Sequence, residues 1–342
     1  MSREITEKLN TLNVATADFM TGVVSQLNYD NALSSRMMKK SKGVRGGEKI
    51  RVPLEYGEEN VSTKGEYEKY NFQPKELITA AFYDWKNVSG DMAISKKKLK
   101  VQNVGKPALI DIAKTKTKNL SRTMRKKFSQ YLFSTSVGSK DPDSLVKIAA
   151  TTDNTVGGID ASTCTKFNWN PEVLDLTGES ITKANLLDAT HTYCIENVLR
   201  MIFGRLTWEN DKPTIGLVTQ GLWDVYEKYL QSQRRYEGKA GEADGGFEYL
   251  KFRNVPLFVD NNVPGGKANS VESGNAMIMI LNEEFLGYRH AEGVKFEWQK
   301  WQKMQDQPIY FSILDWYGAF VTSRRDRQGS VLGLPIDSEL NG

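Results

Sequence analysis

Four side chains of the sequence could together bind a zinc ion. His191 and Cys194 are three residues apart, which places them on one face of a helix, and Cys164 and His290 would complete a set of two thiolates and two imidazoles. Zinc sites are usually marked by closely spaced cysteines, and these two lie far apart in the sequence. The simpler interpretation is a core thiol at Cys194 and a surface imidazole at His191. We therefore predict no metal ion and no other cofactor.

The remaining candidate motifs do not support catalysis. Two pairs of adjacent glutamates, at 58–59 and 283–284, point to opposite sides of a strand and form no acid–base pair. The segment from Asp260 begins like a calcium loop, but it has Pro264 at its fifth position and Val271 at its twelfth, where a glutamate is needed. The sequence contains no glycine-rich phosphate loop, no GxSxG motif and no HExxH motif. We predict that the protein is not an enzyme.

The composition is that of a folded protein without a membrane span. Of the 342 residues, 39% are hydrophobic and 10% aromatic, which is enough for a packed core and excludes wholesale disorder. The best apolar run, 276–281, is six residues long, whereas a span needs about 18. The N-terminus has no apolar stretch typical of a secretory signal. Two cysteines form no disulfide framework, so we expect a reducing, cytosolic origin and no membrane partner.

Positive charge is concentrated in one segment. Between Lys96 and Lys127 there are twelve Lys or Arg residues and a single acid, Asp111. This segment carries a net charge of +11 while the whole chain carries +4, so the rest of the chain carries −7. Such a distribution suggests contact with an anionic surface, either nucleic acid or an acidic neighbouring subunit. The alternative is a lysine-rich face that is simply solvated.

The sequence next predicts an arm followed by a long hairpin. The first forty residues are polar, with a short helix between Thr16 and Leu27, and must dock on something larger. Strict alternation from residue 48 to 56 predicts a half-exposed strand, and a second strand runs from Leu77 to about Ile94 beyond a charged tip. The apolar faces of this ribbon have no partner nearby in the sequence, which predicts burial against another subunit. The predicted intersubunit contacts are Tyr56, Lys64, Tyr67, Tyr70, Phe72 and Trp85.

The strongest predicted helix covers residues 107–134. Its apolar positions 113, 117, 120, 124, 128 and 131 form one stripe, which predicts a helix lying flat on a sheet. Cations on the neighbouring face would point toward an anion-rich space. The candidate DNA-facing residues are Lys114, Lys118, Arg122 and Arg125.

The second half of the chain predicts a compact α+β lobe and a final aromatic strand region that ends in the basic turn Arg324–Arg327. The predicted elements are helices at 183–205 and 221–236 and strands at 214–219, 249–260 and 276–281, and the aromatic section 294–321 is strand-like.

This order of elements resembles the tailed-bacteriophage major capsid protein, which has the Hong Kong 97-like fold. The resemblance covers essentially the whole chain and implies an α+β fold in four parts. The parts are an N-terminal arm at 1–43, an E-loop hairpin at 44–95, a P-domain at 96–180 and 291–342 with its spine helix at 107–134, and an A-domain at 181–290. The phrases that carry the resemblance are YDNAL at 29–33, GGEKIRVPL at 46–54, TVGGID at 155–160, WN at 169–170, NVPLFVD at 254–260 and SRR at 323–325.

The resemblance implies a function and a set of partners. A major capsid protein self-assembles as hexamers and pentamers into an icosahedral shell around packaged double-stranded DNA. It would act with a portal and with separate scaffold or decoration proteins, and it would be located in the virion after assembly in the host bacterial cytoplasm. The arm is too short for the scaffolding segment that some members carry, which implies a separate scaffold or none. Two alternatives are an encapsulin-like compartment shell and a cytosolic nucleic-acid-binding protein that uses the basic helix.

Overall fold

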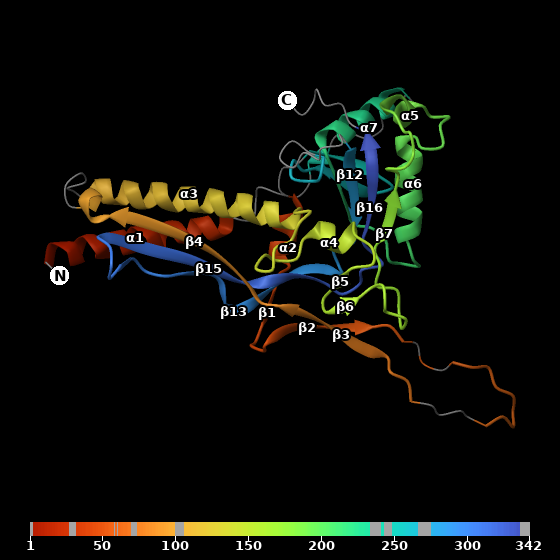
Figure 1. Cartoon of the computed structure of the whole chain (residues 1–342), viewed down its shortest axis with the longest axis horizontal. Coiled ribbons are helices and arrows are strands. Elements are labelled where there is room, and N and C mark those ends of the chain that lie inside the picture. The colour runs from red at the N-terminus through yellow and green to blue at the C-terminus, as the bar shows by residue number, and fades with distance from the viewer. Residues whose placement is uncertain are drawn as a thin grey trace.

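Two sheets and a projecting hairpin make up the structure (Figure 1). It is a computed structural model that describes residues 3–26, 32–57, 59, 61–69, 74–99, 106–232, 241–242, 248–265 and 275–335. A long sheet with two long helices occupies one end of the molecule, and a lobe built on the second sheet occupies the other. The hairpin extends away from both.

The long sheet has the order β1–β13–β15–β14, and β4 pairs with β15 as well. Its longest strand, β15, is antiparallel to both β13 and β4. Helix α3 (Lys106–Leu132) runs along this sheet, as the apolar stripe predicted, and buries Leu120, Met124 and Phe128. The strands are β1 (Lys42–Val44), β4 (Lys86–Ser95), β13 (Leu286–Trp298), β14 (Gln302–Lys303) and β15 (Ile309–Thr322).

The N-terminal arm packs on the same end of its own chain. It forms α1 (Arg3–Gln26), longer than the predicted helix, and α2 (Ala32–Lys39). Leu12 of α1 is fully buried, and the indole N–H of Trp301 donates to the Thr16 hydroxyl at 3.0 Å. The buried Leu12 side chain and the hydrogen bond from Trp301 therefore hold the arm on the long sheet, where α1 lies beside α3.

The hairpin is shorter than predicted. Strands β2 (Lys49–Glu55) and β3 (Ile78–Asp84) pair with each other in register. The prediction of one strand from Leu77 to Ile94 is wrong, because Trp85 separates β3 from β4 and β4 continues along β15 instead. The break is fixed by the Trp85 indole, whose N–H donates to the Gly47 carbonyl at 2.8 Å.

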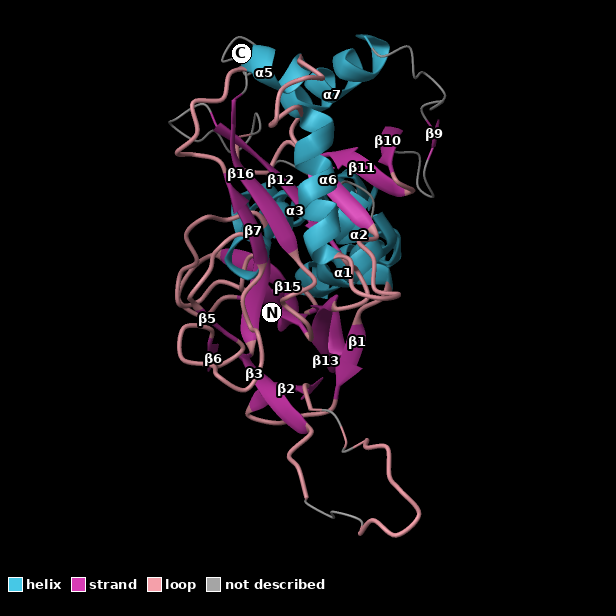
Figure 2. Ribbon diagram, turned by 90° about the vertical axis from the view of Figure 1, so that its right-hand side faces the viewer, coloured by secondary structure: helices cyan, strands magenta, loops and turns pink. Residues whose placement is uncertain are grey.

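The lobe contains a seven-stranded sheet of order β7–β16–β12–β8–β11–β10–β9, with helices on one face (Figure 2). In β12 the even positions 276, 278 and 280 join the core under the helices, while 277, 279 and 281 join the core of the long sheet. The sheet of the lobe is therefore buried on both faces at β12. Its strands are β7 (Glu172–Asp175), β8 (Ile215–Val218), β9 (Gly241–Glu242), β10 (Glu248–Phe252), β11 (Val255–Val259), β12 (Asn275–Leu281) and β16 (Gly329–Pro335), and its helices are α5 (Lys183–Leu187), α6 (Ile195–Leu206) and α7 (Gln220–Ser232).

Two predicted elements of the lobe are divided in the structure. The helix expected at 183–205 is interrupted after α5, because the Asp188 carboxylate accepts hydrogen bonds from the backbone N–H and the hydroxyl of Thr190 and so stabilises a turn. The strand expected at 249–260 is a hairpin, since Arg253 and Asn254 adopt φ angles of 46° and 68° and reverse the chain between β10 and β11.

A fully buried arginine holds the centre of the molecule together. Arg325 is 0% exposed and lies beside α4 (Leu145–Ala149) and the small hairpin of β5 (Thr155–Val156) and β6 (Ile159–Asp160). No carboxylate in the described part of the chain pairs with it. Burial lowers the pKa of Arg325 to about 10, so the guanidinium stays charged at neutral pH. Its donors reach the carbonyl oxygens of Lys147 (3.0 Å), Ile148 (2.8 Å), Asn154 (3.4 Å) and Trp169 (3.1 Å), the Thr151 carbonyl, and the side-chain oxygen of Asn154.

Replacing Arg325→Gln is expected to lower the free energy of unfolding by at least about 3 kcal/mol, because several buried carbonyls lose their donors at once. The neighbouring Arg324 provides the matched control, since it is half-exposed and pairs with Asp211 at 3.1 Å. Arg324→Gln should lower the free energy of unfolding by about 1 kcal/mol or less. Urea unfolding of each variant measures both, and equal losses would contradict the role given to Arg325.

Candidate functional site

The inner face of the projecting hairpin packs on its own chain. Along β2, Ile50, Val52 and Leu54 are buried while the intervening residues are exposed, as the alternation predicted. From β3, the Tyr83 hydroxyl donates to the Thr322 carbonyl at 3.0 Å and accepts from the Thr322 N–H at 3.2 Å. Burial raises the pKa of Tyr83 well above its usual value. The paired strands β2 and β3, which we call the root of the hairpin, are thereby bonded to the end of β15.

A glycine turn supports the same face. Gly157 has φ of 60° and accepts a hydrogen bond from the Phe82 N–H at 2.8 Å. A Cβ atom on this glycine would lie 2.8 Å from the Cβ of Ala81 and 2.9 Å from the Tyr83 ring. The inference that the ribbon has no partner in its own chain is therefore wrong for its inner face. That partner lies more than 70 residues along the chain, beyond the reach of local sequence patterns.

The hairpin root and tip differ in their surroundings. At the root, Tyr56 stacks on Phe167 with ring centroids 5.3 Å apart, and Trp85 packs against the core. At the tip, Tyr67 is 93% exposed. Lys64, also at the tip, donates to the Lys69 carbonyl. The two remaining predicted contact residues, Tyr70 and Phe72, lie outside the described residues.

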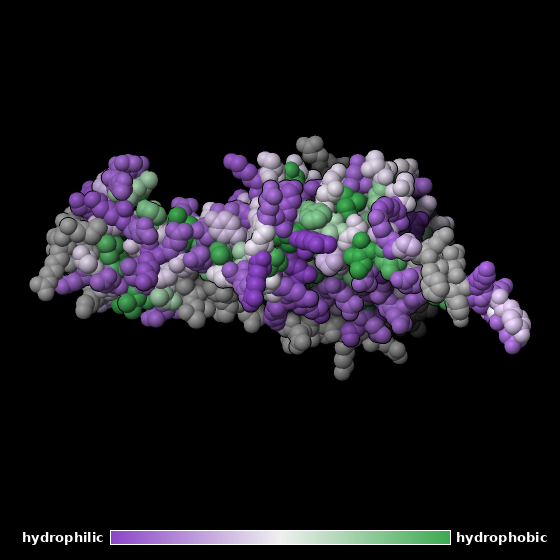
Figure 3. Space-filling model, turned by 90° about the horizontal axis from the view of Figure 1, so that it is seen from below, coloured by the Kyte–Doolittle hydropathy of each residue, from purple (hydrophilic) through white to green (hydrophobic). Residues whose placement is uncertain are grey.

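The tip and the outer face of the hairpin offer uncovered apolar side chains. Val61 is 95% exposed, and Ile78 and Phe82, which share the outer face of β3, are 60% and 48% exposed. The lower surface of the molecule is mainly hydrophilic with separate small hydrophobic patches, and the tip extends beyond the rest of that surface (Figure 3). These residues are available to another chain.

The basic face predicted on the long helix is present on α3. Lys114, Lys118 and Arg122 are exposed, and no described carboxylate forms an ion pair with them. Lys114 lies over the Phe19 ring of α1, with its Nζ 5.9 Å from the ring centroid. Arg125 is half-buried and donates to the Ser121 hydroxyl at 3.4 Å. Three of the four predicted cations thus form an open anion-attracting surface, and the fourth is partly held by its own helix.

Structural comparison decides the fold. No family model and no curated protein matches the sequence. The chain is similar to the capsid of a native GTA particle (TM-score 0.56, 8% identity, covering 87% of this chain and 90% of the other). It is similar to the capsid of the cyanophage P-SCSP1u (TM-score 0.51, 12% identity, 85% of each chain). It is also similar to the holo-SrpI encapsulin of Synechococcus elongatus (TM-score 0.50, 11% identity, 86% and 84%). The chain has the Hong Kong 97-like fold.

Within this Hong Kong 97-like chain, the zinc hypothesis fails on geometry. His191 lies in the turn between α5 and α6, not on a helix with Cys194, so the expected shared helix face is wrong. Cys194 is 1% exposed in the core of the lobe, as the simpler interpretation proposed. Among the residues whose positions are described, no three His, Cys, Asp or Glu side chains are grouped so that they could hold a metal ion. A search of the same residues finds no helix long and apolar enough to cross a membrane.

Sequence reasoning missed the residues that hold the hairpin root in this Hong Kong 97-like fold. Gly157 gave a usable signal, because the Gly157–Gly158 pair marks a tight turn. Phe167 gave none. In the sequence Arg325 stands out only as part of the basic turn and of the SRR phrase, and its burial was not predicted because arginine is mostly exposed in folded proteins. Their importance appears only when distant segments are brought together.

Replacing Gly157→Ala is expected to lower the free energy of unfolding by about 1–3 kcal/mol, because the new methyl group meets β3 at a positive φ. The Phe82 amide should exchange faster with deuterium, since its acceptor is displaced. Gly204→Ala is the matched control, because this exposed glycine lies within α6 with nothing within 4 Å of an added Cβ. It should stabilise the protein by about 0.5–1 kcal/mol. An unchanged Phe82 exchange rate in Gly157→Ala would contradict the contact.

Proposed function

We propose that this chain is the major capsid protein of a tailed bacteriophage, which self-assembles into the icosahedral shell around packaged double-stranded DNA. The observation that carries the proposal is the hairpin, whose root is bonded to its own subunit while its tip leaves Val61 and Tyr67 almost wholly exposed. A fixed root with an uncovered tip suits a contact with a neighbouring copy. The shared fold with capsid chains supports the same conclusion.

In this proposal the four parts have separate roles. The arm (1–43) and most of the P-domain (96–180 and 291–342) form the long body together with β4, and the β2–β3 part of the E-loop segment (44–95) reaches a neighbour. The A-domain (181–290) forms most of the compact lobe, to which the P-domain segments contribute β7 and β16. Copies assemble as hexamers and pentamers. The partners are a portal and separate scaffold or decoration proteins, and the assembled protein is located in the virion. The protein acts as a structural component and not as an enzyme.

A second candidate is an encapsulin-like compartment shell. The similarity to the holo-SrpI encapsulin covers as much of the chain as the similarity to the cyanophage capsid, which favours no single type of shell. The basic surface of α3 favours the phage capsid, because eight cations and a single acid on that helix suit a phosphate-rich interior. The content of the particles distinguishes the two: nuclease-resistant DNA of uniform length supports the capsid, and a protein cargo supports the compartment.

Deleting residues 57–75 is expected to leave a folded protein that forms no shells, because the tip would no longer reach a neighbour. Negative-stain electron microscopy of the expressed full chain should show closed particles, and the deletion variant should show none. Circular dichroism checks that the variant is folded. Normal shells from the deletion variant would exclude the hairpin as an assembly contact, and a full chain that stays monomeric would contradict the shell function.

Reversing two charges as Lys118→Glu and Arg122→Glu is expected to spare empty shells and to impair DNA retention. Each phosphate contact that is lost should reduce the salt dependence of DNA binding by about one unit of log–log slope. Nuclease-protected DNA in purified particles is the measurement. The control reverses Lys140 and Lys212, two exposed lysines outside α3. If the variant forms few empty shells, and the particles that do assemble hold DNA normally, the basic face is an intersubunit contact instead.

A further inference from the structure

Strand β4 has a free edge. Its ten residues pair with β15 on one side, and no other described strand pairs with it. The Lys96 N–H donates to the Pro308 carbonyl at 2.8 Å, and the Ile313 carbonyl accepts from Gln299 on the far side of β15. Because antiparallel pairing alternates, the even residues of β4 bond to β15 and the odd residues direct their N–H and C=O groups outward. The outward positions are Asn87, Ser89, Asp91, Ala93 and Ser95.

A groove follows this free edge beneath α3. One hollow of about 560 Å³ is lined by residues 88–93 of β4, and a second of about 580 Å³ by residues 93–95. The two hollows share Ala93 and Lys116, so they form one continuous groove. Successive side chains of a strand point to opposite faces of the sheet. A hollow over one face would be lined by every second residue, so a hollow lined by six successive residues lies along the edge of the strand. Its length along β4 fits an extended segment of about eight residues.

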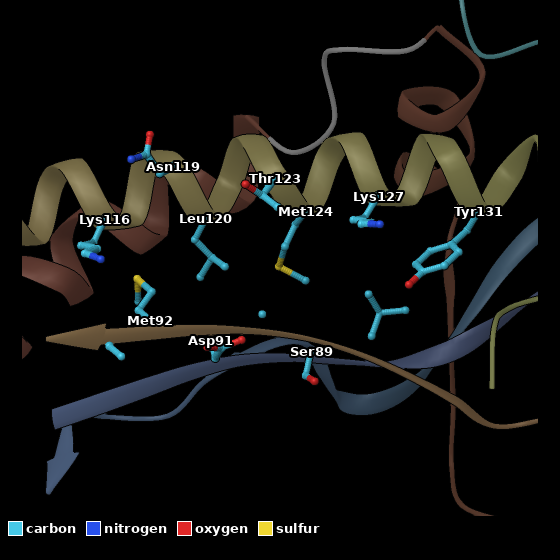
Figure 4. A pocket seen from close by; sticks show the side chains of 13 residues that line it. Ser89, Asp91, Met92, Lys116, Asn119, Leu120, Thr123, Met124, Lys127 and Tyr131 are labelled. Carbon is cyan, nitrogen blue, oxygen red and sulfur yellow. The ribbon is translucent and has the colours of Figure 1, made fainter. Parts of the chain in front are cut away.

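The groove has an apolar floor and a polar wall, both from α3. Leu120 and Met124 point from the helix toward β4, with Lys116 and Lys127 along the same side (Figure 4). Gly90 keeps the floor close, since a Cβ there would lie 2.5 Å from the Leu120 methyl carbon. Both side chains are packed against β4, with Leu120 8% and Met124 3% exposed, so they close the groove on the side of the helix.

The charges of the wall are separate from the basic face described above. At about 100° per residue, Lys116 and Lys127 lie on the opposite side of α3 from Lys114 and Lys118. The charged residues that line the groove are Lys98, Lys116 and Lys127 against Asp91 and Asp111, which leaves one positive charge in excess. The potential along the groove therefore favours a negatively charged occupant.

We propose that this groove binds an extended, acidic peptide segment of a partner protein, which adds a strand to the free edge of β4. The outward N–H and C=O groups of the odd residues would supply main-chain hydrogen bonds to the segment. Lys116 and Lys127 would select acidic residues. The site goes beyond the shell function, because it uses neither the hairpin nor the open basic face.

The test uses a fluorescein-labelled nine-residue peptide, Glu-Val-Glu-Leu-Glu-Val-Glu-Leu-Glu, and the full chain below its assembly concentration. Fluorescence anisotropy should show saturable binding, and hydrogen exchange should show slower amides at Ser89, Asp91 and Ala93. The same peptide N-methylated at alternate residues keeps its charge and apolar groups but loses edge hydrogen bonds, and it should bind at least about tenfold more weakly. Equal binding of the two peptides would overturn the proposal.

Two sets of variants locate the binding site. Lys116→Glu with Lys127→Glu should weaken binding at least about tenfold, whereas Lys114→Glu with Lys118→Glu should change it less than about threefold. Asp91→Pro removes the outward N–H together with the carboxylate and should abolish binding, while Asp91→Ala removes the carboxylate alone and should retain binding. Equal loss in both lysine pairs would show general charge attraction and overturn the proposal. Tighter binding of a peptide of residues 57–77, in competition with the acidic probe, would also overturn it, because the occupant would then be a second copy's hairpin.

Discussion

The guanidinium of Arg325 connects the parts of this structure. It has no carboxylate partner among the described residues, and it is satisfied by main-chain carbonyls from α4, from the following loop and from Trp169. A buried charge of this kind is tolerated only where every donor is bonded, so the loop from 147 to 169 must keep one conformation. The Trp169 indole then donates to the Val156 carbonyl at 3.0 Å, which fixes the turn at Gly157. That turn supports the hairpin.

The same connection fixes one end of the hairpin while its other end stays exposed. Three residues before Arg325, Thr322 exchanges two hydrogen bonds with Tyr83, so the root of the hairpin is bonded to the end of the longest strand. Beyond the root, Val61 is 95% and Tyr67 93% exposed. The hairpin tip, the outer face of β3 and the basic face of α3 are separate surfaces. In the shell proposed above, assembly would depend on the combined effect of several such contacts and not on any single strong site.

Local patterns in the sequence predicted the elements that have one apolar face. The alternation at 50, 52 and 54 gave β2, and the stripe on 107–134 gave α3 within two residues at each end. Predictions failed where a polar side chain closes a turn, as Asp188 does between α5 and α6, or where a strand changes partner, as at Trp85. For the candidate site, sequence placed Lys118 on the exposed face but left the support of the hairpin unseen. The contacts of Gly157 and Arg325 join segments more than 70 residues apart, and no local pattern records them.

Sedimentation velocity of the full chain over a range of concentrations tests the central claim most directly. A shell protein held together by many weak contacts should remain as monomers, pentamers or hexamers at low concentration and convert sharply to particles of very high mass above a threshold. Above that threshold, the concentration of free subunits should stay constant while particles accumulate. A gradual increase in mass, or a chain that stays monomeric or dimeric at every concentration, would contradict a shell-forming function.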